Sequence, residues 1–526
     1  MAGLTAIASV GKKPSSTQFL EIVSQSLRGA LTIKEIESNP FCQSALSSTS
    51  DSSGSSAESI ERGVKIIVDG YFIETLGCKI SSASFFLDEY LKSGLKSVNK
   101  LNGSFNIIII NNKEIKVTVI SDRYGTRPLF YYRNTESLAL SYSSSMLIDL
   151  GITKKTLNMD MVANHLSYSR VWLNDETFFK GIYSVPRSAI ISWSETSGVV
   201  ESFYSNEESK ISFDGSASVE GLAELLKKVV SDFNKVNNLG LSLTGGLDSR
   251  ILLAAGFDGN TFTWGYNEDN DEITLAKRCS ETNLNPWKFI KVTPEEFLDP
   301  SGAGDFIREG LDLFVQSHGL ICYPEVRDSG VSGLMTGLAL DFTMAGSYCP
   351  SNAHDMSEQK MYDYAFKKIE TFSSEDRSLL FKDKSLIERV KNIESAVKNE
   401  LSKDFSKGSA VSALQNFFME NRVRRQIFQR QQWQRAYCED YIPTFDNRLV
   451  DYLSRFSLEE RSNHKIFQKV LLLLSSNLAS IPYQGTNLPA SVPVEYWESA
   501  TQIEAMKEQL YRKIFNETTG MVFVPY

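Results

Sequence analysis

The stretch that decides the fold is Leu239-Gly-Leu-Ser-Leu-Thr-Gly-Gly-Leu-Asp-Ser-Arg-Ile-Leu-Leu-Ala-Ala255. It opens as a short apolar run, breaks at Gly245-Gly246, and resumes with apolar residues at helical spacing until Gly256. This pattern predicts a strand, a tight glycine turn and a helix. Glycines let the backbone approach a ligand closely, and the first N–H groups of a helix favour an anion. We therefore expect phosphate at this turn, among the hydroxyls of Ser242, Thr244 and Ser249.

Strand and helix patterns alternate on both sides of this stretch. A helix is predicted before it, over Val219–Phe233, and the chain beyond Asp355 is mainly helical. Such alternation predicts a parallel sheet with helices on both faces, in which ligands gather at the carboxyl ends of the strands. The predicted elements after the turn are strand Thr261–Trp264, helix Asp271–Thr282, strand Trp287–Val292 and strand Leu334–Gly337.

The amino-terminal part alternates short β-like runs with turns. Strands are predicted over residues 64–68, 71–75, 105–110, 115–120 and 138–142, which indicates an α+β domain with stacked antiparallel sheets. Ser44–Ser59 is almost entirely small and polar, so we predict a loop or disorder there. A second polar stretch, 205–218, predicts a linker between domains 1–204 and 219–526.

Composition limits the possible partners and compartments. The 526 residues suggest two to three domains, and the net charge of -9 argues against nucleic acid or an anionic membrane as main partner. Apolar runs are far shorter than the roughly 20 residues of a membrane span. The six cysteines are scattered, which indicates reduced thiols in a cytoplasmic protein and no zinc site. We interpret one group of basic residues as a solvated or salt-bridged face: Arg422, Arg424, Arg425, Arg430 and Arg435.

The glycine turn carries the most specific resemblance. Thr244-Gly-Gly-Leu-Asp-Ser249 resembles the Ser-Gly-Gly-x-Asp-Ser pyrophosphate loop of the asparagine synthetase and ATP pyrophosphatase families, with Thr in place of the first Ser. The resemblance implies an α/β PP-loop fold of the adenine nucleotide α-hydrolase type, with ATP and Mg²⁺ as cofactors. Asp248 then becomes a metal ligand. The implied pyrophosphate cradle is Ser242, Leu243, Thr244, Gly245, Gly246, Asp248 and Ser249.

Two further segments extend the resemblance. Phe262-Thr-Trp-Gly265 is similar to the family's second strand, where adenine is held, which implicates Trp264 and Gly265. Leu334–Phe342, followed by Gly346-Ser-Tyr348, is similar to Ser-Gly-Glu-Gly-Ser-Asp-Glu followed by Gly-Gly-Tyr. It implies that Gly337 lies at the nucleotide and that Asp341 is the second carboxylate on Mg²⁺.

The residue that handles the proton differs from the family. Leu338 stands where asparagine synthetases carry Glu and β-lactam synthetases carry Tyr, and leucine cannot accept a proton from the amine. Glu439 and Tyr348 are the nearest motif-linked candidates for a relocated base. Lys465 falls where the family keeps a lysine that neutralises phosphate charge, with Lys469 as the rival.

The amino-terminal part resembles the class II glutamine amidotransferase domain, an Ntn-hydrolase-like sandwich. The resemblance rests on Leu101-Asn-Gly-Ser-Phe105 and on Asp122-Arg-Tyr-Gly-Thr-Arg-Pro-Leu-Phe-Tyr131. That family begins Met-Cys-Gly-Ile, whereas Ala2 cannot act as a nucleophile. The segment Asp69–Glu74 and Asn102 also depart from the family's glutamine-binding motifs. We therefore expect no glutaminase activity.

Together these features predict ATP-dependent amide-bond formation through an acyl-adenylate, with release of AMP and pyrophosphate. The amine is expected to come from a source other than glutamine, as in β-lactam synthetases and lasso peptide cyclases. Two alternatives stay open: an ammonia-dependent asparagine synthetase, and a non-catalytic nucleotide-binding pseudoenzyme or scaffold. The expected partners are a small-molecule or peptide carboxylate and an amine, without nucleic acid or membrane, and a homodimer is compatible with the sequence.

Overall fold

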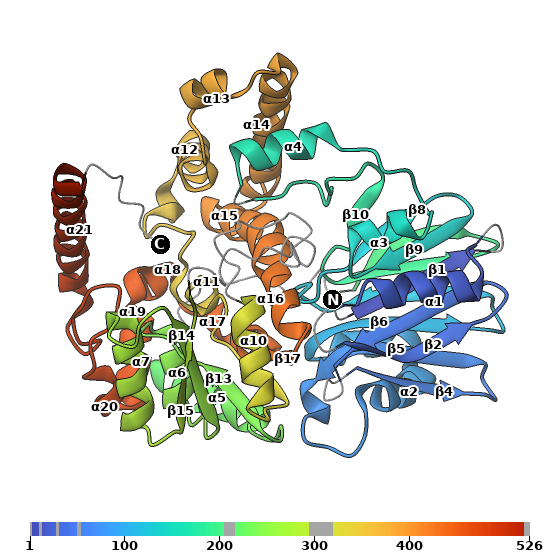
Figure 1. Cartoon of the computed structure of the whole chain (residues 1–526), viewed down its shortest axis with the longest axis horizontal. Coiled ribbons are helices and arrows are strands. Elements are labelled where there is room, and N and C mark those ends of the chain that lie inside the picture. Colours follow the sequence, from blue (N-terminus) through green and yellow to red (C-terminus); the bar gives the residue numbers. More distant parts are fainter. Residues whose placement is uncertain are drawn as a thin grey trace.

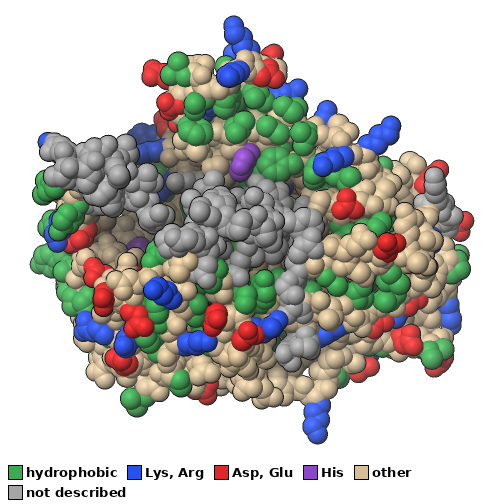
Figure 2. Space-filling model, in the orientation of Figure 1, with side chains coloured by type: hydrophobic (Ala, Val, Ile, Leu, Met, Phe, Trp, Pro, Cys, Tyr) green, Lys and Arg blue, Asp and Glu red, His purple; other side chains and the backbone are tan. Residues whose placement is uncertain are grey.

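The computed structural model describes residues 3–9, 13–27, 31–49, 54–169, 171–204, 216–293 and 319–519. Two antiparallel sheets form the amino-terminal half, and a parallel sheet with surrounding helices forms the rest (Figure 1). None of the described helices combines the length and the apolar character that a bilayer crossing requires. On the face shown in Figure 2, acidic and basic side chains are interspersed over the surface.

The amino-terminal sheets each have six strands and pack face to face. Leu46 of one sheet and Ile108 of the other belong to the same buried cluster between them. Helices α1 (Ser16–Gln25) and α3 (Ser144–Asp149) cover the outside of the first sheet, and α2 (Ser82–Ser93) covers the second. The prediction of stacked antiparallel sheets is confirmed.

The strands of the first sheet are, in spatial order, β10 (Ile182–Ser184), β8 (Phe130–Arg133), β9 (Ser137–Ser141), β1 (Gly3–Ser9), β3 (Cys42–Ser48) and β2 (Thr32–Ser38). Those of the second are β12 (Gly198–Phe203), β11 (Ala189–Ser194), β7 (Lys116–Ser121), β6 (Gly103–Asn111), β5 (Val64–Phe72) and β4 (Ser55–Ser59).

The prediction of a loop or disorder over Ser44–Ser59 is wrong for most of that segment. Residues up to Ser48 belong to β3, which is buried along its whole length between β1 and β2, and Ser55–Ser59 forms edge strand β4. Residues 50–53 lie outside the described part. Serine fits here because strand preference depends on the neighbouring strands, and small side chains pack in the narrow space between the layers.

The second half is organised around a five-stranded parallel sheet in the order β15 (Trp287–Lys291), β14 (Asn260–Gly265), β13 (Leu239–Ser242), β16 (Gly333–Met335) and β17 (Glu439–Tyr441). The chain leaves β13 toward one side of the sheet and later returns to its other side. Such a reversal opens a crevice at the carboxyl ends of the strands. The glycine turn follows β13, so the sheet places it at this reversal point.

Helices cover both faces of this sheet (Figure 1). α5 spans Val219–Phe233, as predicted, and buries Leu226 and Val230 beside Ile251 of α6 (Asp248–Ala254). On the other face α10 (Gly319–Asp328) packs Val326 against Phe262 of β14. The domain limits of 1–204 and 219–526 stay a prediction, because linker residues 205–215 lie outside the described part.

The carboxyl-terminal part is helical, as expected. The further helices are α4 (Met159–Ser167), α7 (Asp271–Thr282), α11 (Leu340–Ala345), α12 (Glu358–Ile369), α13 (Ser374–Leu380), α14 (Lys384–Phe405), α15 (Ala410–Phe418), the π-helix η5 (Met419–Ile427), α16 (Phe428–Arg435), α17 (Asn447–Leu453), α18 (Leu458–Arg461), α19 (Lys465–Leu474), α20 (Ser476–Ala479) and α21 (Trp497–Thr519).

The arginines of η5 and α16 are mostly buried, which corrects the expectation of a solvated face. Arg424 pairs with Asp175 of the amino-terminal half and with Glu420, while Arg435 pairs with Asp440 at 3.2 Å. Arg424, Arg425 and Arg435 are each no more than 6% exposed. The salt-bridged alternative is therefore correct for these residues, and the Arg424–Asp175 pair joins the two halves of the chain.

Arg127 forms the most buried of these links. It follows the turn after β7, and its guanidinium donates to Asp69 at 3.0 Å, to Glu439 of β17, and to the Ser104 carbonyl at 3.1 Å. All of these side chains are at most 8% exposed. The guanidinium therefore connects β5 of the antiparallel sheet to the edge strand of the parallel sheet.

We expect Arg127→Met to lower the free energy of unfolding by about 3–5 kcal/mol, because it leaves two buried carboxylates without their cation. Urea unfolding measures the change. The matched control is Arg133→Met, whose partner Glu201 lies in a more exposed pair; it should cost about 1 kcal/mol or less. Equal effects of the two substitutions would contradict the role of Arg127.

A second prediction concerns Glu400 of α14, whose carboxylate accepts from the Asn421 amide at 2.7 Å. Burial chiefly, with the nearby Glu420 and Asp175, raises the pKa of Glu400 to about 7. The folded state therefore holds this proton more tightly than the unfolded chain, and stability falls as pH rises from about 4.5 to 7.

Glu400→Gln should remove this loss, so its melting temperature should exceed that of the parent protein at pH 8 and equal it at pH 4.5. The gain at pH 8 should be at most about 3 kcal/mol. Glu388→Gln, exposed on the same helix, is the control and should leave the pH profile unchanged. A gain that is independent of pH would contradict the assignment.

Candidate active site

The glycine turn after β13 is held in shape by its own polar groups. The Thr244 N–H donates to the Ser249 hydroxyl at 3.1 Å, and the Gly246 N–H donates to the Thr244 hydroxyl at 3.2 Å. A Cβ at Gly245 would lie 3.0 Å from the Glu272 carbonyl oxygen of α7, so the turn also packs tightly against the next helix. Thr244, Gly245, Gly246 and Ser249 thus form one compact loop.

Arg250 fixes the orientation of this loop from its buried side. Its side chain is 0% exposed, and among the described residues no carboxylate pairs with it. The guanidinium donates to four carbonyls: Gly245 at 3.0 Å, Pro482 at 2.9 Å, Ile481 at 2.7 Å and Leu478 at 3.3 Å. Because carbonyl and N–H point in opposite directions in a trans peptide, holding the Gly245 carbonyl inward directs the Gly246 N–H outward.

Two carboxylates meet beside the loop. The Asp341 N–H donates to the Asp248 carboxylate. Burial is the larger cause, and the negative charge of Asp341 the second, that raise the pKa of Asp248 well above its ordinary value. Gly337 makes this approach possible, since a Cβ there would lie 2.7 Å from the Asp248 carbonyl carbon. The structure therefore brings together Asp248, Asp341 and Gly337, as the sequence predicts.

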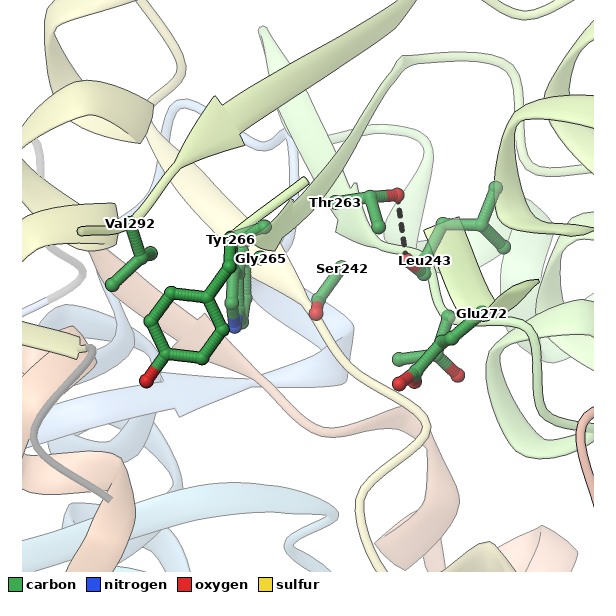
Figure 3. Close-up of a pocket in the computed structure, with 9 residues that line it drawn as sticks. Ser242, Leu243, Thr263, Gly265, Tyr266, Glu272 and Val292 are labelled. Carbon is green, nitrogen blue, oxygen red and sulfur yellow. Dashed lines mark hydrogen bonds between the residues drawn. The ribbon is translucent and has the colours of Figure 1, made fainter. Parts of the chain in front are cut away.

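A pocket of about 240 Å³ opens between β13, β14 and α7. Five of the residues predicted to bind the nucleotide line it: Ser242, Leu243, Thr244, Trp264 and Gly265. Figure 3 shows Tyr266 and Val292 on one side, Glu272 on the other, and Ser242 between them. The Thr263 hydroxyl donates to the Leu243 carbonyl at 2.8 Å and so joins the two strands behind the pocket.

Several site residues escaped the sequence analysis: Arg250, Thr263, Tyr266, Glu272, Val292 and His464. Glu272 and Tyr266 could have been found, because both stand at the carboxyl end of β14 or in the first turn of the helix that follows. Arg250 lies inside the quoted motif, but its four carbonyl partners come partly from more than 200 positions away.

The structure agrees only in part with the prediction that Lys465 is the lysine that neutralises phosphate charge. Lys465 lies 3.6 Å from Glu459 and is 35% exposed, and its rival Lys469 is exposed. The preceding residue, His464, lies near Asp341: burial lowers the pKa of His464 while the Asp341 carboxylate opposes that shift. Its left-handed backbone (φ 61°) and the rings of Phe467 and Trp497 hold it there.

Of the two bases proposed to replace the residue at position 338, Tyr348 packs against the same buried cluster as Leu338. The Tyr348 ring stacks on Phe418 at 4.6 Å, and its hydroxyl accepts from Arg422 at 2.6 Å. Tyr348 is therefore a polar group at the same cluster as Leu338, and the Thr444 hydroxyl donates to the Leu338 carbonyl at 2.7 Å.

Glu439 does not suit the role of base. Its carboxylate pairs with Arg127 and accepts from the Asp440 N–H at 3.0 Å, and the side chain is 3% exposed. It stands at the amino end of β17, opposite Gly333, whereas the loop and Asp341 follow the carboxyl ends of β13 and β16. The buried ion pair between the halves of the chain is the physical reason for this correction.

The residues at the glutamine-motif positions are also engaged in that interface. Asp69 pairs with Arg127, and the Asn102 amide donates to Asp446 at 2.9 Å while its oxygen accepts from the Asn447 N–H. Glu74 lines a pocket of about 630 Å³ between the halves, together with Arg448. Ala2 lies outside the described residues.

Residues 79–204 match the family model of the glutamine amidotransferase domain. This part of the chain is amidotransferase-like. No curated protein sequence gives a match.

Two solved structures are similar at a remote level. One is glutamine phosphoribosylpyrophosphate amidotransferase from B. subtilis complexed with ADP and GMP: 11% identity, 67% of this chain and 82% of that chain covered, TM-score 0.26. The other is described as the allosteric regulatory enzyme of purine biosynthesis, with 10% identity, coverage of 56% and 68%, and TM-score 0.26. At this level of similarity neither structure bears on the function of this chain.

The residues present fit ATP and Mg²⁺. Mg²⁺ in proteins is commonly held by one or two carboxylates together with phosphate oxygens, and it would relieve the repulsion between Asp248 and Asp341. The described residues contain no group of three or more acidic, Cys or His side chains that would hold a metal alone. The rings of Trp264 and Tyr266 give the pocket the flat apolar walls that a purine requires.

We expect Arg250→Met to lower the free energy of unfolding by about 3 kcal/mol or more, because four carbonyls lose their donor. Arg250→Lys should lower the free energy of unfolding by less than Arg250→Met does, because lysine keeps the positive charge but not the planar guanidinium. Arg278→Met, on the exposed face of α7, is the control. Chemical unfolding monitored by tryptophan fluorescence measures all three, and a neutral Arg250→Met would show that the loop does not depend on this side chain.

Proposed function

We propose that the protein is an ATP-dependent amide ligase. It activates a carboxylate as an acyl-adenylate, transfers the acyl group to an amine other than glutamine-derived ammonia, and releases AMP and pyrophosphate. The observation that carries the proposal is the meeting of Asp248 and Asp341 beside the loop held by Arg250, next to the Trp264 pocket.

Each part of the site would have a separate role. The pocket of Ser242, Leu243, Trp264 and Gly265 would hold the adenosine, and the loop from Thr244 to Ser249 would hold the phosphates. Asp248 and Asp341 would orient Mg²⁺, which neutralises charge on the departing pyrophosphate. Among the described residues no carboxylate balances the buried guanidinium of Arg250, so it would favour an anion bound in the adjacent loop.

Tyr348 would orient the amine. Its hydroxyl oxygen accepts from Arg422, so its own O–H can be directed toward a reacting group beside Leu338. Two observations favour the second candidate, a nucleotide-binding protein without catalytic turnover: position 338 is leucine, and Glu439 is paired with Arg127. The two candidates differ in one measurable property: both bind Mg²⁺–ATP, but only the ligase forms AMP.

The test is a pyrophosphate-release assay with Mg²⁺ and ATP over carboxylates, paired with amines, ammonium or glutamine. We expect AMP formation with an amine and none with glutamine as the only nitrogen source, because Ala2 cannot attack the amide. Asp248→Asn should lose at least about 100-fold in turnover and the thermal stabilisation by Mg²⁺–ATP, because one metal carboxylate is removed. The matched control, Asp258→Asn, changes an exposed carboxylate just after α6 and should behave as the parent protein.

Each outcome separates the candidates. Failure of the parent protein to bind Mg²⁺–ATP would reject both, and binding without AMP formation across the panel would favour the nucleotide-binding scaffold. AMP formation with aspartate and ammonium alone would identify an ammonia-dependent asparagine synthetase. Formation of AMP that depends on glutamine would overturn the predicted loss of glutaminase activity.

A further inference from the structure

Glu272 brings a carboxylate to the pocket between β13, β14 and α7, and the proposed ligase reaction gives it no role. It is the second residue of α7 and is half-buried. Its carboxylate accepts from the Gln484 amide at 3.2 Å, and among the described residues no Lys, Arg or His pairs with it. Burial raises the pKa of Glu272, and the bond from Gln484 opposes that shift. The carboxylate therefore keeps acceptor capacity for a donor on a ligand.

The backbone of Glu272 packs directly against the glycine turn. A Cβ at Gly245 would lie 3.0 Å from the Glu272 carbonyl oxygen and 3.1 Å from its Cα. The Gln484 N–H donates to the Gly245 carbonyl at 3.2 Å, so the residue that holds the Glu272 carboxylate also holds the turn. Side chains in a helix lean toward its N-terminus, which here follows the carboxyl end of β14. Glu272 therefore lies at the end of the pocket that adjoins the glycine turn.

The two ends of the pocket suit different parts of a nucleotide. Trp264, Tyr266 and Val292 supply apolar surface at one end, and Figure 3 shows Glu272 across from Tyr266 and Val292, with Ser242 between them. A base fits the apolar end, and phosphates fit the glycine turn. Because the ribose joins the base to the phosphates, it lies between these two ends, and its hydroxyls come within reach of the Glu272 carboxylate.

The ribose is the part of a nucleotide whose donors match a carboxylate. Its 2′- and 3′-hydroxyls can donate to carboxylate oxygens, as they do in dinucleotide sites where an acidic residue holds the 2′-hydroxyl. Phosphate oxygens only accept, so a carboxylate repels them. The described residues contain no group of three or more acidic, Cys or His side chains suited to a metal, so Glu272 does not belong to a preformed metal cluster.

We propose that Glu272 binds the ribose hydroxyls of the nucleotide and makes the site select a ribonucleotide over its 2′-deoxy form. This role of Glu272 rests on the nucleotide site of the proposed function. Gln484 is the positioning residue, because its amide holds the Glu272 carboxylate and its N–H holds the glycine turn. The sugar contact and the phosphate contact are thereby set at a fixed separation.

Isothermal titration calorimetry of the full-length protein with Mg²⁺–ATP and with Mg²⁺–2′-dATP tests the contact. The parent protein should bind ATP about 10- to 100-fold more tightly, the range expected for a hydrogen bond to a charged group. Glu272→Ala should abolish most of this preference, and Gln484→Met should reduce it in part. The matched control is Glu268→Ala, an exposed carboxylate just before α7, which should keep the parent's preference. Melting temperatures of the free proteins check that each variant folds.

The outcomes separate the sugar contact from the ligase reaction. Equal affinity of the parent protein for the two nucleotides, or an unchanged preference in Glu272→Ala, would overturn the role of Glu272 and leave the ligase proposal standing. An equal loss of affinity for both nucleotides in Glu272→Ala would show a contact to another part of the nucleotide and also overturn it. A protein that shows the predicted preference but forms no AMP would support the ribose contact and reject the ligase.

Discussion

The guanidinium of Arg127 is the contact on which the arrangement of the two halves depends. It bonds Asp69 of β5 and Glu439 of β17, and Arg435 and Asp440 lie in the same buried cluster. The cluster holds three carboxylates against two guanidiniums, and burial raises the pKa of both Asp69 and Asp440. Buried ion pairs add little net stability, but a misaligned alternative would leave charges unpaired, so they select one docking geometry.

That geometry has a consequence for the active site. β17 is the edge strand beside β16, and β16 leads into Gly337, Leu338 and Asp341. The Thr444 hydroxyl, just beyond β17, donates to the Leu338 carbonyl at 2.7 Å. Through these contacts the amidotransferase-like half is linked to the segment that carries Asp341. The amidotransferase-like part of the chain therefore also supports the parallel-sheet half.

The sequence was sufficient where structure follows from local pattern. α5 begins and ends at the predicted residues, and the glycine turn, Asp248 and Asp341 lie together because strand ends of one parallel sheet must meet at one edge. It was insufficient where a side chain finds its partner far along the chain. Glu439 resembles a motif residue, but Arg127, 312 positions away, decides its role. The serines of β3 became a buried strand because β1 and β2 flank them.

The two buried arginines, Arg127 and Arg250, have opposite electrostatic surroundings. Arg127 is surrounded by carboxylates, which raise its pKa and fix its charge in a balanced cluster. Among the described residues Arg250 donates to carbonyl oxygens and pairs with no carboxylate, and burial lowers its pKa. A positive charge kept unbalanced inside a protein is costly unless something nearby supplies the missing negative charge. The guanidinium of Arg250 holds the Gly245 carbonyl of the glycine loop, so an anionic group bound by that loop would lie near the buried charge and would help to compensate it.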